Sequence, residues 1–125
     1  MRLLLLAILG GALGSGARHL VNIGAARLVG IGFPWGTFTV NIVGAFLMGL
    51  FIEALALKFQ GSLELRTFFA TGVLGGFTTF SAFTLDVVQM MEHGQLGLAA
   101  AYAFGSVVLC IVALGAGFMV ARIIF

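Results

Sequence analysis

Charged residues are scarce in this chain. Asp, Glu, Lys and Arg make up 8% of it, whereas a soluble domain carries about 25%. Cysteine occurs once, at Cys110, which excludes an intrachain disulfide and a thiolate metal cluster. The two histidines, His19 and His93, have no nearby set of further ligands. No nucleophile, base and orienting group assemble in the sequence, so we do not expect an enzyme.

Long apolar runs are what the chain has instead. Hydrophobic residues make up 62% of its 125 residues, and a membrane-spanning helix needs roughly 20 apolar residues. The runs predict an all-α integral membrane protein, with one four-helix domain over residues 1–125 and spans at about 3–20, 36–57, 68–88 and 96–120. The six basic residues lie mostly at the ends of these spans. This placement indicates membrane topology and interface anchoring, with no sign of nucleic-acid binding.

The N-terminus allows two interpretations. Met1 and Arg2 precede an apolar stretch with small residues, as in a cleavable signal peptide. We expect a retained first span, because the apolar stretch reaches Ala17 and three further spans follow. Arg18 and His19 would close this span, and Pro34 with Trp35 would begin the next helix.

The third span carries features that a plain membrane helix would not have. Gly75 and Gly76 weaken the helix near its middle, and Thr78, Thr79 and Ser81 bring hydroxyl groups to the same depth. An interrupted helix exposes backbone groups that lipid cannot satisfy, so the interruption must face protein, water or an ion. We therefore predict a functional site there.

The other spans contain few polar side chains. Asn41, in the second span, is explained equally well as an interhelical hydrogen-bonding group and as a donor lining a water or ion path. Tyr102, Ser106 and Cys110 follow one another at intervals of four, so they share one face of the fourth helix. This stripe must turn away from lipid, and its repetition favours the lining of a pathway.

Phe80 and Phe83 lie three residues apart and share a helix face after the interruption. Packing is the simpler explanation in a chain with 13 Phe, while the positive ring edges offer contacts to a small anion. We expect no Lys, Arg or carboxylate at the centre of any span. Hydroxyl and amide groups without a fixed charge suit passive movement of a small polar solute or ion.

Three sequence blocks resemble the Fluc/CrcB family of fluoride channels. They are GGALGSGARHL at 10–20, GTFTVNIVGAFLMG at 36–49 and GVLGGFTTFSAF at 72–83. The third block is the most specific, because it resembles the family signature G-x-x-G-G-x-T-T-F-S-x-F. His19 departs from the family, which commonly has Tyr at that position.

The resemblance implies a passive, fluoride-selective channel that exports fluoride from the cytoplasm. By motif position, a structural sodium ion would be held by the backbone carbonyls of Gly75 and Thr78. Pore positions would be occupied by three residues that match the family directly, Asn41, Phe80 and Phe83, and by four further polar residues, Thr79, Ser81, Tyr102 and Ser106. Arg18 would lie near an aqueous vestibule.

The resemblance also implies an antiparallel, dual-topology homodimer, multi-pass in the bacterial inner membrane, with fluoride and the lipid bilayer as its other partners. Two other functions remain open from the residues alone. A small multidrug-type proton-coupled exporter has a similar length, but it needs a membrane-embedded Glu that 3–20 lacks. A non-transporting packing subunit would explain the glycines, but it leaves the polar stripe without a purpose.

Overall fold

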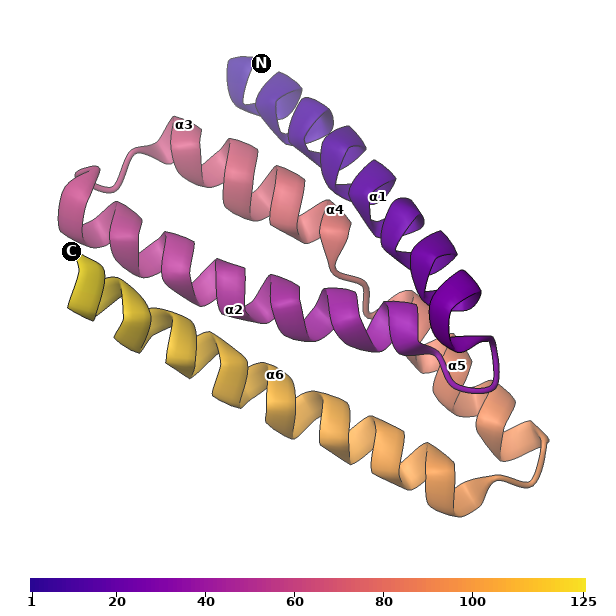
Figure 1. The fold of residues 1–125 in the computed structure, drawn as a ribbon. Helices are drawn as coiled ribbons and strands as arrows, with labels where there is room; N and C mark the ends of the chain where they lie inside the picture. Colours follow the sequence, from indigo (N-terminus) through magenta and orange to yellow (C-terminus); the bar gives the residue numbers. More distant parts are fainter.

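The computed structural model describes all 125 residues as helices joined by short connections (Figure 1). The elements in chain order are α1 (Arg2–Val29), α2 (Trp35–Lys58), α3 (Leu63–Leu65), the π-helix η1 (Arg66–Leu74), α4 (Gly75–Phe77), α5 (Ser81–Glu92) and α6 (Leu96–Ile124). Four segments are long and apolar enough to cross a membrane: α1, α2, the third segment Leu63–Glu92 and α6. The chain is thus an all-helical, multi-pass membrane protein.

The first helix is longer than the apolar run suggested. It continues through Arg18 and His19, and its last residue is Val29. Arg18 does not end the helix. Its side chain is half-buried, and the residues that follow it are mostly apolar and remain helical. Gly30 ends α1 with a φ of 84°, a left-handed conformation that glycine adopts without steric cost. The following helix begins at Trp35 after Pro34, as predicted.

The first part of the third segment, from α3 to α4, lies between α1 and α2, and α6 lies along the other side of α2 (Figure 1). α2 packs mainly against α6, and α1 packs mainly against η1 and α4. Gly14 of α1 lies so close to Val73 and Phe77 that no Cβ would fit there. Small residues allow such close approach of helices in lipid, where packing rather than the hydrophobic effect drives association. The third segment is therefore held directly against the backbone of α1.

The third segment has an irregular backbone. η1 is a π-helix of nine residues, a rare form that occurs frequently at functional sites. Gly75 and Gly76, which we expected to weaken the helix, are themselves helical within α4. The non-helical residues come directly afterwards: Thr78 is extended, with φ −84° and ψ 161°, and α5 begins at Ser81. Gly76 keeps its place in the helix because Gly11 and Ser15 of α1 pack against it.

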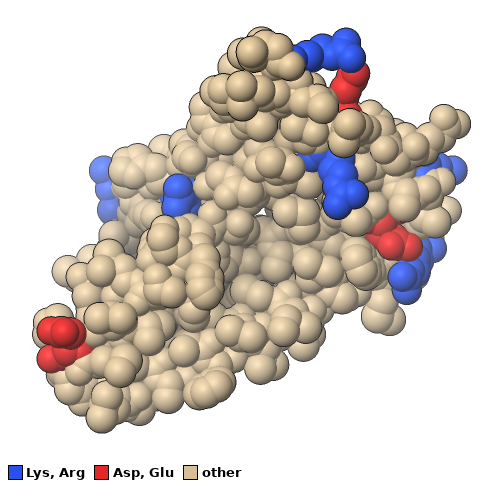
Figure 2. Space-filling model, turned by 180° about the vertical axis from the view of Figure 1, so that it is seen from behind, with Lys and Arg blue, Asp and Glu red and all other residues tan.

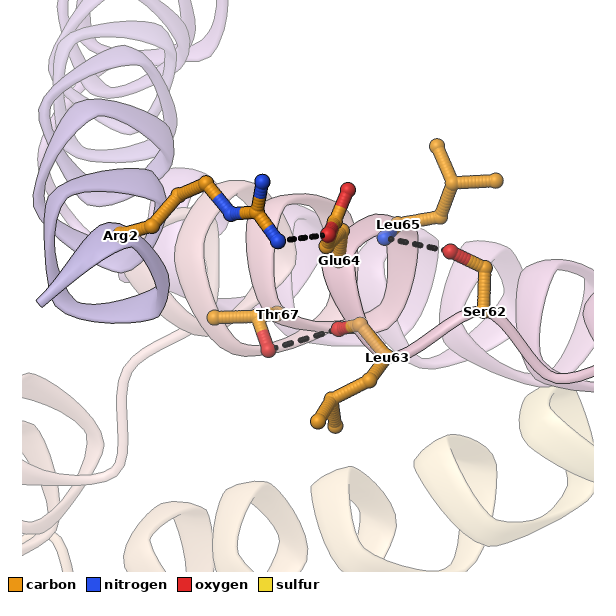
Figure 3. Close-up of polar contacts among 6 residues, drawn as sticks. All are labelled: Arg2, Ser62, Leu63, Glu64, Leu65 and Thr67. Carbon is orange, nitrogen blue, oxygen red and sulfur yellow. Dashed lines mark hydrogen bonds and ion pairs between the residues drawn. The ribbon is translucent and has the colours of Figure 1, made fainter.

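The two chain termini lie at the same end of the molecule (Figure 1). Two exposed ion pairs lie at this end, Arg2 with Glu64 at 2.6 Å (Figure 3) and Arg122 with Glu53 at 3.0 Å. They connect α1 to α3 and α6 to α2. Charged side chains lie mostly toward the ends of the face in Figure 2, and the area between them is largely uncharged. This distribution is the one expected for a protein surrounded by lipid.

Candidate functional site

An open pocket of about 210 Å³ lies where α2, the interrupted third segment and α6 meet. Its walls bring together residues from blocks far apart in the sequence: Asn41, Thr78, Thr79, Phe80, Phe83, Ser106, Val107 and Cys110. None of these side chains is charged. Most of the residues predicted from the sequence as pore-lining are therefore neighbours in space.

Asn41 contacts the interruption directly. Its Oδ1 accepts a hydrogen bond from the Thr79 amide at 2.8 Å, and its Nδ2 donates to the Thr79 carbonyl at 3.0 Å. One side-chain amide thus satisfies both backbone groups of a residue that has left the helix. The two interpretations of Asn41 are not exclusive, because the second Nδ2 hydrogen is not used in these bonds.

The same region leaves two carbonyl groups without their helical donors. In a continuous helix, the amides of Thr79 and Ala82 would donate to the carbonyls four residues earlier, those of Gly75 and Thr78. Here the Thr79 amide donates to Asn41, and the Ala82 amide donates to Thr79 Oγ1 at 3.2 Å. Carbonyl oxygens released in this way are the donor type that hard cations take.

Ser106 has an unpartnered hydroxyl group on the pocket wall. Its side chain is 5% exposed, and its Oγ makes no hydrogen bond. A buried hydroxyl without a partner costs free energy, so this group is available to a ligand. Asn41 and Ser106 come from different helices and leave donors on the same pocket.

Tyr102 lies beside this pocket rather than on its wall. It is 2% exposed, and its hydroxyl donates to Asp86 Oδ2 at 2.9 Å. Asp86 lines a second cavity of about 350 Å³ with other polar side chains, including Asn22, Thr37, Gln89 and His93. Phe83, on the wall of the first pocket, packs against the Tyr102 ring with centroids 5.2 Å apart. Tyr102 therefore connects Phe83, on the wall of the first pocket, to Asp86, on the wall of the second cavity.

Three other predicted residues lie outside the pocket wall. Ser81 is exposed, with its Oγ 3.4 Å from Thr79 Oγ1. Gly75 is exposed within α4, one turn before the pocket. Arg18 lies half-buried inside α1, away from the pocket, and forms no ion pair.

The sequence patterns did not single out Asp86, whose carboxylate accepts the Tyr102 hydrogen bond and lines the second cavity. A signal for it was present, because Asp86 and Tyr102 each lie eight residues from Gly94 (94 − 86 = 8 and 102 − 94 = 8). Gly94 has a φ of 74° in the turn between α5 and α6, so positions at equal distances from it lie at similar heights in the helix hairpin. Thr37, on the wall of the second cavity, gave no comparable signal.

Chemically, the pocket offers hydroxyl and amide donors and aromatic edges without any fixed charge. Such a lining replaces part of an ion's hydration shell and still allows release. No group of three His, Cys, Asp or Glu residues could hold a metal ion. The arrangement suits passage of a small ion better than a chemical reaction.

Comparison with known proteins gives consistent matches along the chain. The family described as CrcB-like protein, Camphor Resistance (CrcB), matches residues 5–118. A protein of Mesorhizobium japonicum named fluoride-specific ion channel FluC is 55% identical over 119 residues, which cover 95% of each chain. A protein of the same name from Agrobacterium fabrum is 53% identical over 93% of each chain. Another from Caulobacter vibrioides is 51% identical over 100% of this chain and 99% of its own length. The chain belongs to the CrcB-like protein family.

Proposed function

We propose that this chain is a passive, fluoride-selective ion channel that releases fluoride from the cytoplasm. Relatives that cover nearly the whole chain carry the name fluoride-specific ion channel. The observation that carries the proposal is the uncharged pocket on which the unpartnered Ser106 hydroxyl and the Asn41 amide meet. The protein is an ion channel and not an enzyme.

Fluoride is small and strongly hydrated, so a pore must offer donors close together. Asn41 supplies an N–H from α2 and Ser106 an O–H from α6 to the same pocket. Thr79 lines this pocket too, and the Ser81 hydroxyl lies 3.4 Å from the Thr79 hydroxyl. Ring edges at Phe80 and Phe83 add a weaker positive potential. We assign the Tyr102 hydroxyl to the same path, because Tyr102 lies between the two cavities in contact with Phe83 and Asp86. A fixed positive charge on this wall would hold the anion too tightly for rapid release.

Arg18 would act at a distance from the pocket. Its guanidinium has no carboxylate partner, so its charge is not neutralised locally. An uncompensated cation near an aqueous vestibule raises the local concentration of anions. We therefore retain Arg18 as a vestibule residue that attracts fluoride and does not bind it in the pore.

An antiparallel homodimer is the assembly that best covers the open face of the interruption. Phe80 is 68% exposed, and Ser81 and Thr84 are exposed beside it. Polar groups and irregular backbone at this depth are unfavourable against lipid. A second copy would cover them. The basic residues divide four to two between the two sides of the membrane, Arg2, Lys58, Arg66 and Arg122 against Arg18 and Arg27, and this weak bias allows insertion in both orientations. The membrane would be the bacterial inner membrane.

A structural sodium ion fits the released carbonyls. Gly75 and Thr78 would hold it by backbone oxygen, and the symmetry of a dimer would supply the same pair twice. The ion would then connect the two interruptions at the centre of the assembly. The support for this site is that the Thr79 and Ala82 amides donate to side chains, which leaves the two carbonyls without helical donors.

Replacing sodium by a larger organic cation is expected to lower the melting temperature of the purified protein. Saturating a site at a hundred times its dissociation constant stabilises the folded state by about 2.7 kcal/mol. Melting curves in sodium chloride and in N-methylglucamine chloride at equal ionic strength measure this effect. Identical melting temperatures in the two salts would exclude the sodium site.

The channel itself is tested by anion efflux from liposomes that contain the purified protein. Fluoride and chloride electrodes read the two anions in parallel, and a potassium ionophore balances the charge. Rapid fluoride efflux with little chloride efflux supports the proposal. Absence of fluoride efflux from folded, reconstituted protein would disprove it.

Ser106→Ala is expected to reduce fluoride efflux without reducing stability. The hydroxyl has no internal hydrogen bond to lose, so its removal should leave the unfolding free energy unchanged or raise it. Ser15→Ala, at an exposed serine of α1, is the matched control for efflux. A large drop in melting temperature for Ser106→Ala would instead assign a structural role to the hydroxyl.

A further inference from the structure

Two hydrogen bonds join the side chain of Asn41 to the backbone of a single residue. The bonds to the Thr79 amide and carbonyl measure 2.8 and 3.0 Å, and the two residues are 38 positions apart in the chain. The geometry resembles the pairing of two backbone peptide groups, with the side-chain amide taking the place of one of them. We call this pair of bonds the Asn41 clamp.

The clamp changes the hydrogen bonding of the residues around it. Thr79 is 9% exposed, and an unpaired backbone group at such a position would be costly. With its amide bound to Asn41, Thr79 cannot close the helical turn to Gly75. Thr79 Oγ1 in turn accepts from the Ala82 amide at 3.2 Å, where α5 begins. The hydrogen bonds of Thr79 therefore determine where α4 ends and where α5 begins, and Asn41 keeps Thr79 in position to make them.

We propose that Asn41 is a positioning residue that keeps the third segment interrupted at Thr78–Phe80. The clamp provides, from α2, the hydrogen bonds that the backbone of Thr79 loses by leaving the helix. By diverting the Thr79 amide it also releases the Gly75 carbonyl. The positioning role of the clamp does not depend on which ion the protein transports. The binding of a cation by the released Gly75 carbonyl rests on the proposed function.

Contacts on the neighbouring turn of α2 agree with this role. The side chain of Thr78 packs against Gly44, one turn after Asn41 on α2, where no Cβ would fit. The Thr78 hydroxyl donates to the Leu74 carbonyl at 2.9 Å, which fixes the residue before the clamp. α2 therefore holds two successive residues of the interruption, one by packing and the other by hydrogen bonds.

The test is residue-resolved amide hydrogen exchange, measured by NMR on the full-length protein in detergent micelles. In Asn41→Leu, which keeps the side-chain volume and removes both bonds, we expect exchange of the Thr79 amide to accelerate at least about tenfold, since a tenfold change in an equilibrium is 1.4 kcal/mol. Amides in the middle of α1 and α6 should exchange at unchanged rates. The sodium-dependent rise in melting temperature should be lost in the same variant.

Ser106→Ala is the matched control, because it alters the same pocket without touching the clamp. It should leave the exchange of Thr79 and the sodium dependence as in the unaltered protein, even though its fluoride efflux falls. If Asn41→Leu does not fold, Asn41→Gln moves the amide by one methylene and should also accelerate exchange of Thr79. Unchanged Thr79 exchange in whichever variant folds overturns the proposal.

The outcomes also separate this inference from the proposed function. If the unaltered protein transports no fluoride but Asn41 variants still accelerate exchange at Thr79, the clamp stands and the channel proposal fails. If transport is present and exchange at Thr79 does not depend on Asn41, the amide serves only as a pore donor. Faster exchange with an unchanged sodium effect would retain the clamp and overturn its consequence for the cation.

Discussion

Gly14→Ala is expected to destabilise the four-helix fold strongly, by about 3 kcal/mol. A Cβ at this position would overlap the carbonyl oxygen of Val73 and crowd the amide of Phe77. Both atoms belong to the backbone, so the clash is relieved only by moving α1 away from the third segment. Overpacking typically costs about 1–3 kcal/mol and occasionally more, and we expect the upper end of this range. The yield of monodisperse protein after size-exclusion chromatography and its melting temperature measure the loss.

Gly16→Ala is the control for this experiment. It lies two residues further along α1, and a Cβ there would meet no atom within 4 Å. In an open position, alanine favours a helix over glycine by roughly 0.5–1 kcal/mol, so Gly16→Ala should be as stable as the unaltered protein or slightly more so. Equal melting temperatures for the two variants would show that α1 does not need the close contact at Gly14.

Phe80→Leu is expected to lower fluoride efflux at least about tenfold, which corresponds to roughly 1.4 kcal/mol in the barrier. Leucine keeps most of the apolar volume and removes the aromatic ring, whose positive edge we assign to the anion path. Phe80 is 68% exposed, and its only aromatic partner is Phe83, with centroids 5.6 Å apart. Its replacement should therefore disturb packing within the subunit very little. Liposome efflux at equal protein content measures the effect.

Phe104→Leu serves as the comparison for Phe80→Leu. Phe104 is 74% exposed on α6 and does not line the pocket. Its replacement should leave fluoride efflux unchanged. If both variants transport fluoride at the rate of the unaltered protein, the ring of Phe80 has no part in permeation, and the phenylalanines of the third block would serve packing.

The helices were predictable to the extent that apolar runs and end signals determine them. Pro34 and Trp35 marked the start of α2 correctly. The end of α1 was misplaced, because Arg18 looked like a terminus while the true end at Gly30 depends on its positive φ. The π-helical winding of η1 could not be foreseen from composition, since it reflects how the third segment fits against α1.

For the candidate site, the sequence predicted most of the residues that lie around one pocket but not how they pair. Asn41 was recognised as a polar residue inside a span, and both of its interpretations required a partner. That partner is the backbone of Thr79. The pattern of side chains in a sequence does not reveal which backbone groups lack a helical hydrogen bond. The stripe formed by Tyr102, Ser106 and Cys110 was predicted as one lining. The structure divides it, with Tyr102 bonded to Asp86 and the other two on the pocket.

The position of both termini at one end of the molecule limits how two copies can be joined in a single gene. A short hydrophilic linker from Phe125 to the next Met1 would keep both copies in the same orientation, because each copy begins and ends on the same side of the membrane. Opposite orientations would require a linker that itself crosses the bilayer, with roughly 20 apolar residues. Tandem fusions of these two kinds would therefore impose parallel or antiparallel pairing by covalent connection alone.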